Sequence, residues 1–209
     1  MKLLIATPSP YARKARVALH EKGIAFVEEI TVPWNKGTRA PEFNPLGQIP
    51  ALILGDGRSI YDSGVIVEYV DTLADAPRLI PSEPGERVAV RQIEALADGI
   101  CDAIVLIVIE GRRRPELQSR DWVARQRAKV DAGMAELARF LSAGRYFVGD
   151  RFTLADIAAG ATLAFAALRF PESDWADRYP NLARFSERME ARPSFQKSRP
   201  SPQVVEEIG

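Results

Sequence analysis

The N-terminal segment alternates a strand pattern with a helix pattern, and this alternation constrains the fold more than any other feature of the chain. Residues 2–7 form a β-rich apolar run, and residues 25–32 form a second one. Between them, Ser9 and Pro10 open a helix over residues 11–22, because serine is a preferred N-cap and proline fits the first helical position. A strand, a helix and a strand in this order predict a parallel pair with a right-handed crossover.

The next segment predicts a hairpin and one further helix. Residues 51–54 and 58–61 are short apolar runs on either side of an Asp-Gly dipeptide, which supplies the positive φ of a tight turn. Asp62 and Ser63 then stand at the start of a helix. The stretch before the hairpin, residues 44–50, is too rich in turn residues to be regular, and one short helix is expected ahead of it. This half is therefore predicted to be an α/β domain with the order βαβ, α, ββα.

The rest of the chain has the pattern of an all-helical protein. Residues 77–85 carry several prolines and a glycine and are expected to form a linker. Four helical patterns follow, over residues 86–110, 119–141, 152–168 and 179–191. The last segment is rich in proline and is expected to be a surface tail. The chain is thus predicted to have an α/β domain over residues 1–76 and an all-α domain over residues 86–209.

Composition excludes several classes of function. The chain has 28 Lys and Arg against 28 Asp and Glu, so its formal net charge is zero, whereas binding to nucleic acid needs a basic excess. One His and one Cys are too few for a Cys/His zinc site or an internal disulfide. No uncharged run approaches the length of about 20 residues that a membrane-spanning helix needs. Prolines interrupt the N-terminal apolar run before a secretory signal can form, and the expected location is cytoplasmic.

One local signal in the helical half is sharp, and it concerns folding. Thr153 and Asp156 have the spacing of a capping box, with a hydroxyl at the N-cap and an acidic residue three positions later. Phe152 and Ile157 stand at the positions of a hydrophobic staple. We expect these residues to cap the start of a helix, and Thr153→Ala should lower the stability of the protein by about 0.5–2 kcal/mol.

Three local features can carry chemistry, and each also has a purely structural explanation. Ser9 lies where a strand turns into a helix; the helix N-terminus stabilises anions, and the same hydroxyl can simply cap it. The Ile49–Pro50 bond lies between a turn and a strand; a cis bond there would expose the backbone of Ile49 to a ligand, although most such bonds are trans. Asp62 and Ser63 can receive an ammonium and a carboxylate, or can cap the helix that they start.

Other reactive residues have structural explanations. His20 lies about three turns along the helix from Ser9, so the two cannot act as nucleophile and base. Cys101 lies in an apolar helix and is expected to be a buried, inert thiol. The arginines at 112–114 follow a helix, where cations suit the C-terminal dipole. A role of these arginines at a ligand or dimer surface is the alternative.

Four of these signals occur in an order and spacing that resemble the cytosolic glutathione transferases over nearly the whole chain. They are Ser-Pro-Tyr-Ala-Arg-Lys-Ala-Arg-Val-Ala-Leu at 9–19, Asn-Pro-Leu-Gly-Gln-Ile-Pro at 44–50, Asp62 and Ser63 with Glu68 and Tyr69 after them, and Phe-Thr-Leu-Ala-Asp-Ile-Ala at 152–158. The resemblance is to bacterial members that use serine and to zeta-like and omega-like members. It implies a thioredoxin-like domain that binds glutathione as co-substrate, followed by an all-α domain that carries the site for a small hydrophobic electrophile. It also implies a homodimer without a metal.

The resemblance assigns roles to the three candidate features. Ser9 matches the position of the catalytic Ser or Cys, whose side chain stabilises the thiolate of glutathione. Ile49, before the presumed cis-Pro50, matches the residue whose backbone pairs with the cysteinyl part of glutathione. Asp62 and Ser63 match the acidic–serine pair that holds the γ-glutamyl end, and Asp62 is shorter than the Glu or Gln of many relatives.

Four further residues are placed near glutathione by the resemblance alone. Lys36 or Gln48 is expected to meet the glycine carboxylate, in a loop that aligns poorly with the family pattern. Tyr11 follows the Ser-Pro turn and is expected to line the same pocket. Asp98, in the first helix of the all-α domain, is expected to approach the glutathione of a partner subunit.

Two departures from related patterns narrow the chemistry. The Ser-Pro-Tyr-Ala turn stands where glutaredoxins have two cysteines, so a mixed-disulfide mechanism, which needs a protein thiolate, is not expected. The double-serine-cysteine turn of zeta-like isomerases is absent, so isomerisation of maleylacetoacetate is not favoured. Two alternatives stay open: a non-catalytic binding or regulatory protein of the same fold, of the stringent-starvation type, and an enzyme specialised for dehalogenation or ether cleavage.

Overall fold

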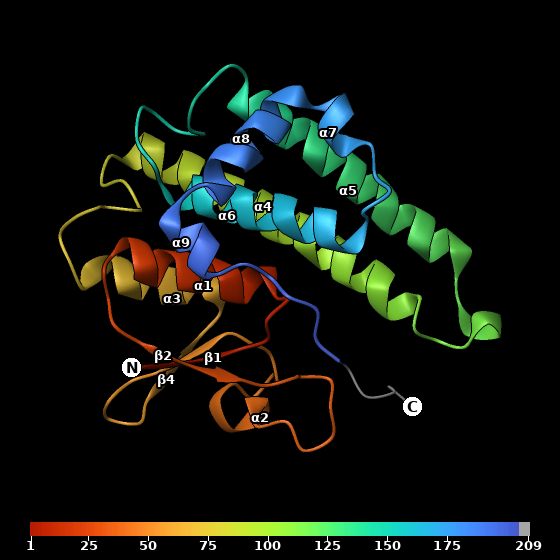
Figure 1. The fold of residues 1–209 in the computed structure, drawn as a ribbon, viewed down its shortest axis with the longest axis horizontal. Coiled ribbons are helices and arrows are strands. Elements are labelled where there is room, and N and C mark those ends of the chain that lie inside the picture. Colours follow the sequence, from red (N-terminus) through yellow and green to blue (C-terminus); the bar gives the residue numbers. More distant parts are fainter. Residues whose placement is uncertain (205–209) are drawn as a thin grey trace. The chain divides into compact units, whose positions relative to one another are not determined.

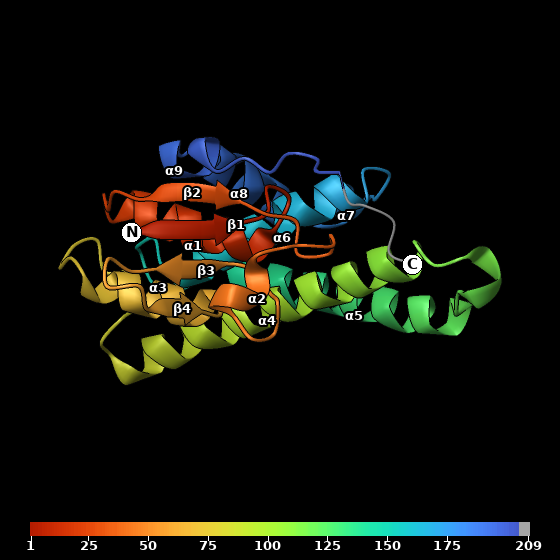
Figure 2. The same cartoon turned by 90° about the horizontal axis from the view of Figure 1, so that it is seen from below.

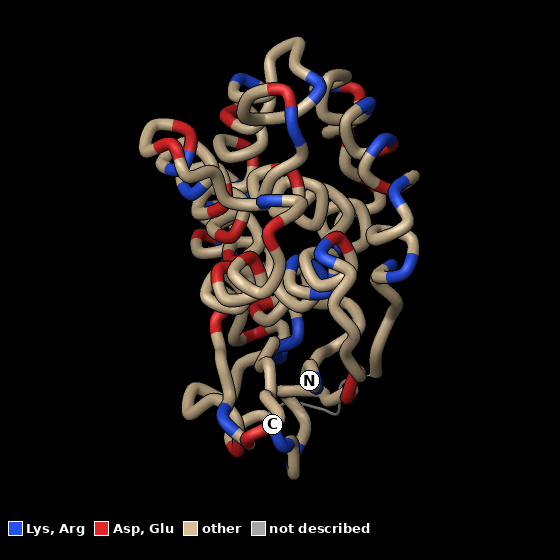
Figure 3. The backbone as a smooth tube through the Cα atoms, turned by 90° about the vertical axis from the view of Figure 1, so that its left-hand side faces the viewer, with Lys and Arg blue, Asp and Glu red and all other residues tan. Residues whose placement is uncertain are grey.

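The computed structural model describes residues 1–204, and the chain divides into two compact units (Figure 1). Unit 1 comprises Met1–Ile80 together with the chain from Arg192 onward, and unit 2 comprises Pro81–Ala191. No helix among the described residues is long and apolar enough to cross a membrane. Lys and Arg are interspersed with Asp and Glu along the backbone (Figure 3), and the two kinds are equal in number.

Unit 1 is built on a mixed sheet of four strands in the order β2-β1-β3-β4 (Figure 2). The strands are β1 (Lys2–Ile5), β2 (Val27–Ile30), β3 (Ala51–Ile53) and β4 (Ser59–Tyr61). β1 and β2 are parallel, as the strand–helix–strand pattern predicts, and β3 and β4 form the predicted antiparallel hairpin. β3 also pairs antiparallel with β1, which joins the two halves of the sheet.

Helices cover both faces of this sheet. They are α1 (Pro10–Glu21), α2 (Ala40–Phe43), α3 (Ser63–Thr72) and α9 (Pro193–Lys197). α1 and α3 pack together on one face, and α2 lies on the other (Figure 1). Leu4 packs on Ala40 of α2, while its neighbours Leu3 and Ile5 are fully buried and point to the opposite face, as alternation along a strand requires. This is the thioredoxin-like arrangement βαβ, α, ββα that the resemblance implies.

The expectation of a surface tail is wrong for the start of the C-terminal segment, up to Ser198, whereas Pro202 beyond it is exposed. Phe195 is fully buried in unit 1, and its carbonyl accepts a hydrogen bond of 3.1 Å from the guanidinium of Arg13 in α1. Arg16, one turn further along α1, donates to the carbonyls of Lys197 and Ser198 at 3.1 and 3.0 Å. The segment was predicted as part of residues 86–209, but residues 192–204 join unit 1 because these two arginines hold its main chain. Residues 205–209 lie outside the described residues.

Unit 2 contains the four predicted long helices and two short ones. They are α4 (Pro84–Glu110), the 3-10 turn η1 (Pro115–Leu117), α5 (Arg120–Leu141), α6 (Leu154–Arg169), α7 (Trp175–Arg178) and α8 (Pro180–Glu190). α4 packs along both α5 and α6. At Gly133 of α5 an added Cβ would lie only 2.5 Å from Ile100 of α4, so glycine permits the close approach of these helices. The turns at η1 and α7 were not predicted, since each is too short to show a helical period.

The predicted capping box at the start of α6 is present. The backbone N–H of Thr153 donates to Asp156 Oδ2 at 2.8 Å, and the Thr153 hydroxyl donates to the same oxygen at 3.1 Å. The backbone N–H of Phe147 donates to Oδ1 at 3.0 Å. The carboxyl group is fully buried, and burial raises its pKa to about 6, against the opposing effect of these hydrogen bonds. Asp156 thus ties the preceding loop to the helix.

Candidate functional site

The strand register brings the three predicted features of unit 1 to one edge of the sheet. Leu4 of β1 pairs with Ala51 of β3, and Ala51 pairs with Tyr61 of β4. The end of β1, the start of β3 and the end of β4 therefore lie side by side. The segments next to these positions are the Ser9 turn, the Ile49–Pro50 dipeptide and the Asp62–Ser63 pair. We take this edge as the candidate site.

Ser9 is the N-cap of α1, and its hydroxyl oxygen accepts a hydrogen bond of 3.1 Å from the backbone N–H of Ala12. Its own N–H donates to the carbonyl of Ala6 at 3.1 Å, which closes the turn after β1. The hydroxyl proton of Ser9 meets no acceptor within residues 1–204, and the side chain is half-buried. The structural explanation of Ser9 as a cap is therefore correct, and it leaves a hydrogen-bond donor at the helix N-terminus.

The loop before β3 is held by Asn44, which sequence reasoning treated only as a turn residue. The buried side chain of Asn44 donates from Nδ2 to the carbonyl of Gln48 and accepts at Oδ1 from the N–H of Leu46, both at 3.0 Å. Gly47, with a φ of +64°, supplies the left-handed residue of this loop. An asparagine that bonds its own backbone two residues on is a known turn signal, and it was the available clue.

The Ile49–Pro50 peptide bond is cis. Ile49 precedes β3, and its side chain packs against the cluster of Leu4, Ala40 and Ala51. Among the described residues, no hydrogen bond engages the backbone N–H or carbonyl of Ile49. These groups are an unused pair at the sheet edge, where an extended peptide can hydrogen-bond to them as to a strand.

Asp62 caps α3, and its backbone adopts an uncommon conformation for a residue other than glycine, with φ 66° and ψ 129°. Its Oδ1 accepts from the N–H of Gly64 at 2.8 Å and of Val65 at 3.4 Å. Ser63, the first residue of α3, is buried. The second carboxylate oxygen of Asp62 has no hydrogen bond among the described residues.

Lys36 and Gln48 are exposed on loops at this edge, and Tyr11 is the half-buried second residue of α1. The loop that carries Lys36 begins where Thr31 donates its N–H to the carbonyl of Ile5 at 2.8 Å, beside the end of β1. The hydroxyls of Thr31 and Thr38 lie 3.1 Å apart and close that loop on itself. Both candidate residues for the glycine carboxylate therefore lie on loops at this edge.

The remaining reactive residues serve packing. The ring of His20 lies 5.1 Å from that of Phe26, and burial is the main cause that lowers its pKa. Cys101 is buried in α4, with its sulfur 3.2 Å from the hydroxyl of Thr162. Asp98 also lies in α4. Within residues 1–204, no group of three or more His, Cys, Asp or Glu side chains is placed to hold a metal ion.

Two family models match the chain: the N-terminal domain of glutathione S-transferase over residues 8–73 and the C-terminal domain over residues 120–188. The GST-like protein YibF of Escherichia coli K12, itself uncharacterized, is 36% identical over 200 residues, which cover 96% of this chain and 98% of YibF.

Solved structures agree with these matches. A glutathione S-transferase of Methylobacterium radiotolerans, crystallised with glutathione sulfonate, has a TM-score of 0.95 and 48% identity over 98% of this chain and 97% of its own. One from Methylobacillus flagellatus, with glutathione bound, has a TM-score of 0.93 and 43% identity over 96% of this chain and 99% of its own. The turns at the sheet edge, the fold and these similarities lead to one conclusion: the chain belongs to the glutathione S-transferase family.

Proposed function

We propose that the protein is a glutathione transferase in which the Ser9 hydroxyl donates a hydrogen bond to the thiolate of bound glutathione. The observation that carries this proposal is the hydroxyl proton of Ser9, which has no acceptor within residues 1–204 although the oxygen caps α1. The two similar transferases that were crystallised with glutathione or its sulfonate support glutathione as the ligand.

Unit 1 offers complementary groups for the rest of glutathione. In the proposed complex the backbone N–H and carbonyl of Ile49 pair with the cysteinyl residue. The unused oxygen of Asp62 accepts from the γ-glutamyl ammonium, and the α-carboxylate of that end binds Ser63 at the N-terminus of α3. Lys36 or Gln48 binds the glycine carboxylate. Tyr11 and Pro50 complete the pocket.

The energy available at Ser9 matches the chemical task. A thiol with a pKa of about 8.5 is only slightly ionised at neutral pH. A hydrogen bond to a charged acceptor contributes about 1.5–3 kcal/mol, which lowers the thiol pKa by about one to two units. The α1 N-terminus adds about 0.3–1 kcal/mol. Together these effects bring the thiol of glutathione close to half ionisation at neutral pH.

The reaction then needs no nucleophile from the protein. The thiol proton leaves to solvent, and the sulfur donates an electron pair to the electrophilic carbon. A sulfur–carbon bond forms while the bond from that carbon to the leaving group breaks, and the leaving group departs with its electron pair. The catalytic contribution of the chain is to hold glutathione and to favour its ionised form. The electrophile site is proposed to lie on the helical part of the chain, and the enzyme is proposed to act as a homodimer.

Calorimetry with glutathione, followed by turnover of chlorodinitrobenzene, tests the proposal. We expect binding at millimolar concentration or below and glutathione-dependent turnover. Ser9→Ala should lower kcat/KM by about tenfold to a hundredfold, whereas Ser9→Thr, which keeps both the hydroxyl and the cap, should retain most of it. Binding without turnover of any electrophile would instead indicate a regulatory member of the family. A chain that does not bind glutathione would contradict the proposal altogether.

A further inference from the structure

Unit 2 contains a partly buried arginine whose charge is not compensated by the protein. Arg169 is the last residue of α6, and its guanidinium lies 5.3 Å from the ring centroid of Phe165, one turn earlier. Its Nε atom is enclosed and has no hydrogen-bond partner among the described residues. No carboxylate of residues 1–204 forms an ion pair with Arg169. Burying a cation without a partner costs free energy, so this arrangement requires an explanation.

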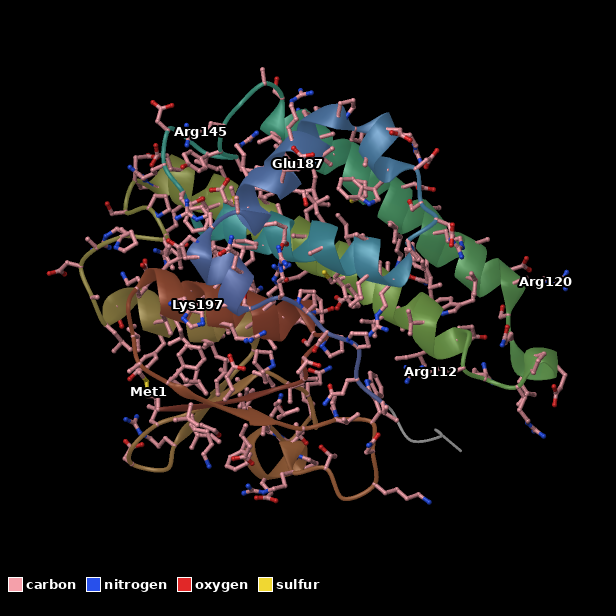
Figure 4. The ribbon with its side chains drawn as sticks, in the orientation of Figure 1. Met1, Arg112, Arg120, Arg145, Glu187 and Lys197 are labelled. Carbon is pink, nitrogen blue, oxygen red and sulfur yellow. The ribbon has the colours of Figure 1, made fainter. Side chains whose placement is uncertain are left out.

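Two further arginines approach the same end of α6 from other helices. Arg112 follows the end of α4 (Figure 4), and its charge is near enough to lower the pKa of Arg169 in addition to the larger effect of burial. Arg127 of α5 lies with its guanidinium 5.3 Å from the ring centroid of Phe170. Neither arginine has a carboxylate partner within the described part of the chain. Like charges from three helices therefore converge without an anion.

Some neighbouring arginines of unit 2 are paired with carboxylates. Arg113 pairs with Glu110 at 3.3 Å, and Arg178 pairs with Asp131 at 3.3 Å. Arg113 thus has a carboxylate partner, whereas Arg112, its neighbour in the sequence, has none among the described residues. Other arginines of unit 2 without a carboxylate partner are exposed, as Arg120 and Arg125 are, or donate to backbone carbonyls, as Arg188 does, whereas Arg169 is half-buried and has neither kind of partner among the described residues.

The residue before Arg127 in α5 is a buried polar side chain without a partner among the described residues. Gln126, next to Arg127 in α5, is fully buried, and neither its amide nitrogen nor its amide oxygen has a partner among the described residues. Buried amides are nearly always hydrogen-bonded, because an unpaired buried polar group costs about 1–3 kcal/mol.

The surroundings define the chemical class of the ligand. A guanidinium presents a planar fork that matches a carboxylate and binds it through two parallel hydrogen bonds. The guanidinium of Arg127 lies over the ring of Phe170, which is half-buried and offers apolar surface, whereas the ring of Phe165 near Arg169 is buried. A carboxylate attached to a planar, apolar body meets both requirements, whereas a neutral apolar molecule leaves the cations unpaired.

We propose that Arg169 and Arg112 form an anion site in unit 2 that binds the carboxylate of an aromatic or unsaturated organic acid. The identification of this acid as the second substrate rests on the transferase function proposed above, with the electrophilic carbon carried on the same body as the carboxylate. The site selects among electrophiles by charge.

Titration calorimetry without glutathione tests the anion site directly. The probes are chloronitrobenzoate and its methyl ester, which share one aromatic body and differ in charge. We expect the acid to bind at least about tenfold more tightly than the ester, and Arg169→Met to abolish this preference. Arg145→Met is the matched control, because the guanidinium of Arg145 also lies over a ring, that of Tyr146 at 5.7 Å, at another place in unit 2. Equal binding of acid and ester, or an equal loss in the control, would overturn the proposal.

Further variants separate an ion site from a change in folding. Arg169→Lys keeps the charge without the planar fork and should retain part of the preference, and Arg112→Met should reduce it more mildly than Arg169→Met. Thermal unfolding reports whether each variant is folded. Competition by inorganic phosphate as strong as that of the acid would contradict the assignment to carboxylates, because phosphate has no apolar body.

Turnover with glutathione distinguishes this proposal from the transferase function itself. We expect kcat/KM for the acid to exceed that for the ester in the parent protein and to fall to the ester value in Arg169→Met. If neither probe is turned over but the acid is still bound selectively, the transferase function fails and the anion site stands. If both are turned over equally, the transferase function stands and the anion site fails.

Discussion

The helix starts at Ser9 and at Thr153 both place a hydroxyl residue at the N-cap. They differ in whether the hydroxyl proton has an acceptor among the described residues. Each hydroxyl residue precedes a helix, α1 in unit 1 and α6 in unit 2. At α6 the device is closed, because the Thr153 hydroxyl donates to Asp156 and that carboxyl also receives the N–H groups of Thr153 and Phe147. At α1 the Ser9 oxygen accepts a hydrogen bond from the N–H of Ala12, and the Ser9 hydroxyl proton has no acceptor among the described residues.

The difference lies in the residue three positions after each hydroxyl. Thr153 has an acidic residue at that position, which accepts every nearby donor and is buried with it. Ser9 has Ala12 there, which offers no side-chain acceptor. A capping residue is therefore structural when its helix satisfies it, and it can act on a ligand when its helix leaves a donor open at an accessible end.

Removing the buried carboxyl is the strongest test of the closed device. Asp156→Ala leaves the N–H groups of Thr153 and Phe147 buried without an acceptor, which should cost about 2–5 kcal/mol of unfolding free energy. Chemical denaturation measures the loss. Asp150→Ala, an exposed carboxylate of the loop before the same helix, should change stability by less than about 0.5 kcal/mol. A loss as small as in this control would show that the device contributes nothing to folding.

The pH dependence of stability tests the burial of the same carboxyl. The pKa of Asp156 is raised from 3.8 to about 6 in the folded state, so the folded protein binds the proton more tightly than the unfolded chain does. Its stabilisation is therefore present at low pH and is lost as pH rises from about 4 to about 6, by up to about 3 kcal/mol. The stability difference between the parent and Asp156→Asn should shrink over this range. A difference that grows with pH would mean that the carboxyl is held as an anion.

A third side chain that bonds its own backbone, Asn44, extends the comparison to the loop of the candidate site. Asn44→Ala removes the bonds to Gln48 and Leu46 and should weaken glutathione binding by about three- to tenfold, by calorimetry. Asn181→Ala is the matched control, because its amide also donates two bonds, to the carbonyls of Ala138 and Ser142 in unit 2. That control should lower stability and leave glutathione affinity unchanged.

The last comparison concerns the caps themselves. Ser9→Ala and Thr153→Ala each remove one capping hydroxyl, and each should cost about 0.5–2 kcal/mol of unfolding free energy. Only Ser9→Ala should alter the ionisation of bound glutathione. If both variants lose the same stability and only Ser9→Ala changes the ionisation of bound glutathione, the capping role and the role toward the ligand are separate. An effect of Thr153→Ala on the bound thiol would contradict this separation.

Features encoded by neighbouring residues could be predicted from the sequence, and features made by distant residues could not. The Ser9 turn, the hairpin and the Asp62 cap depend on residues within a few positions of one another, and each was found where it was expected. The burial of Phe195 depends on Arg13, far away along the chain. Nothing near either residue signals that contact.

Within the candidate site, the bonds of Asn44 to Leu46 and Gln48 are local, and they were missed because Asn44 was treated only as a turn residue. The anion site shows the limit for distant residues. The pair of Arg112 and Arg169 joins the ends of α4 and α6, and no local motif connects them. Arg113 and Arg139 meet carboxylates three positions away in the sequence, whereas the approach of Arg112 to Arg169 depends on the packing of α4 against α6.

The pKa of the glutathione thiol bound to the protein tests the role of Ser9 most directly. Ultraviolet titration of the thiolate follows it in the parent, in Ser9→Thr and in Ser9→Ala. We predict a value about one to two units below that of free glutathione in the parent and nearly the same value in Ser9→Thr. In Ser9→Ala the value should return toward that of the free thiol. A pKa that is equally low in Ser9→Ala would contradict the role of the Ser9 hydroxyl.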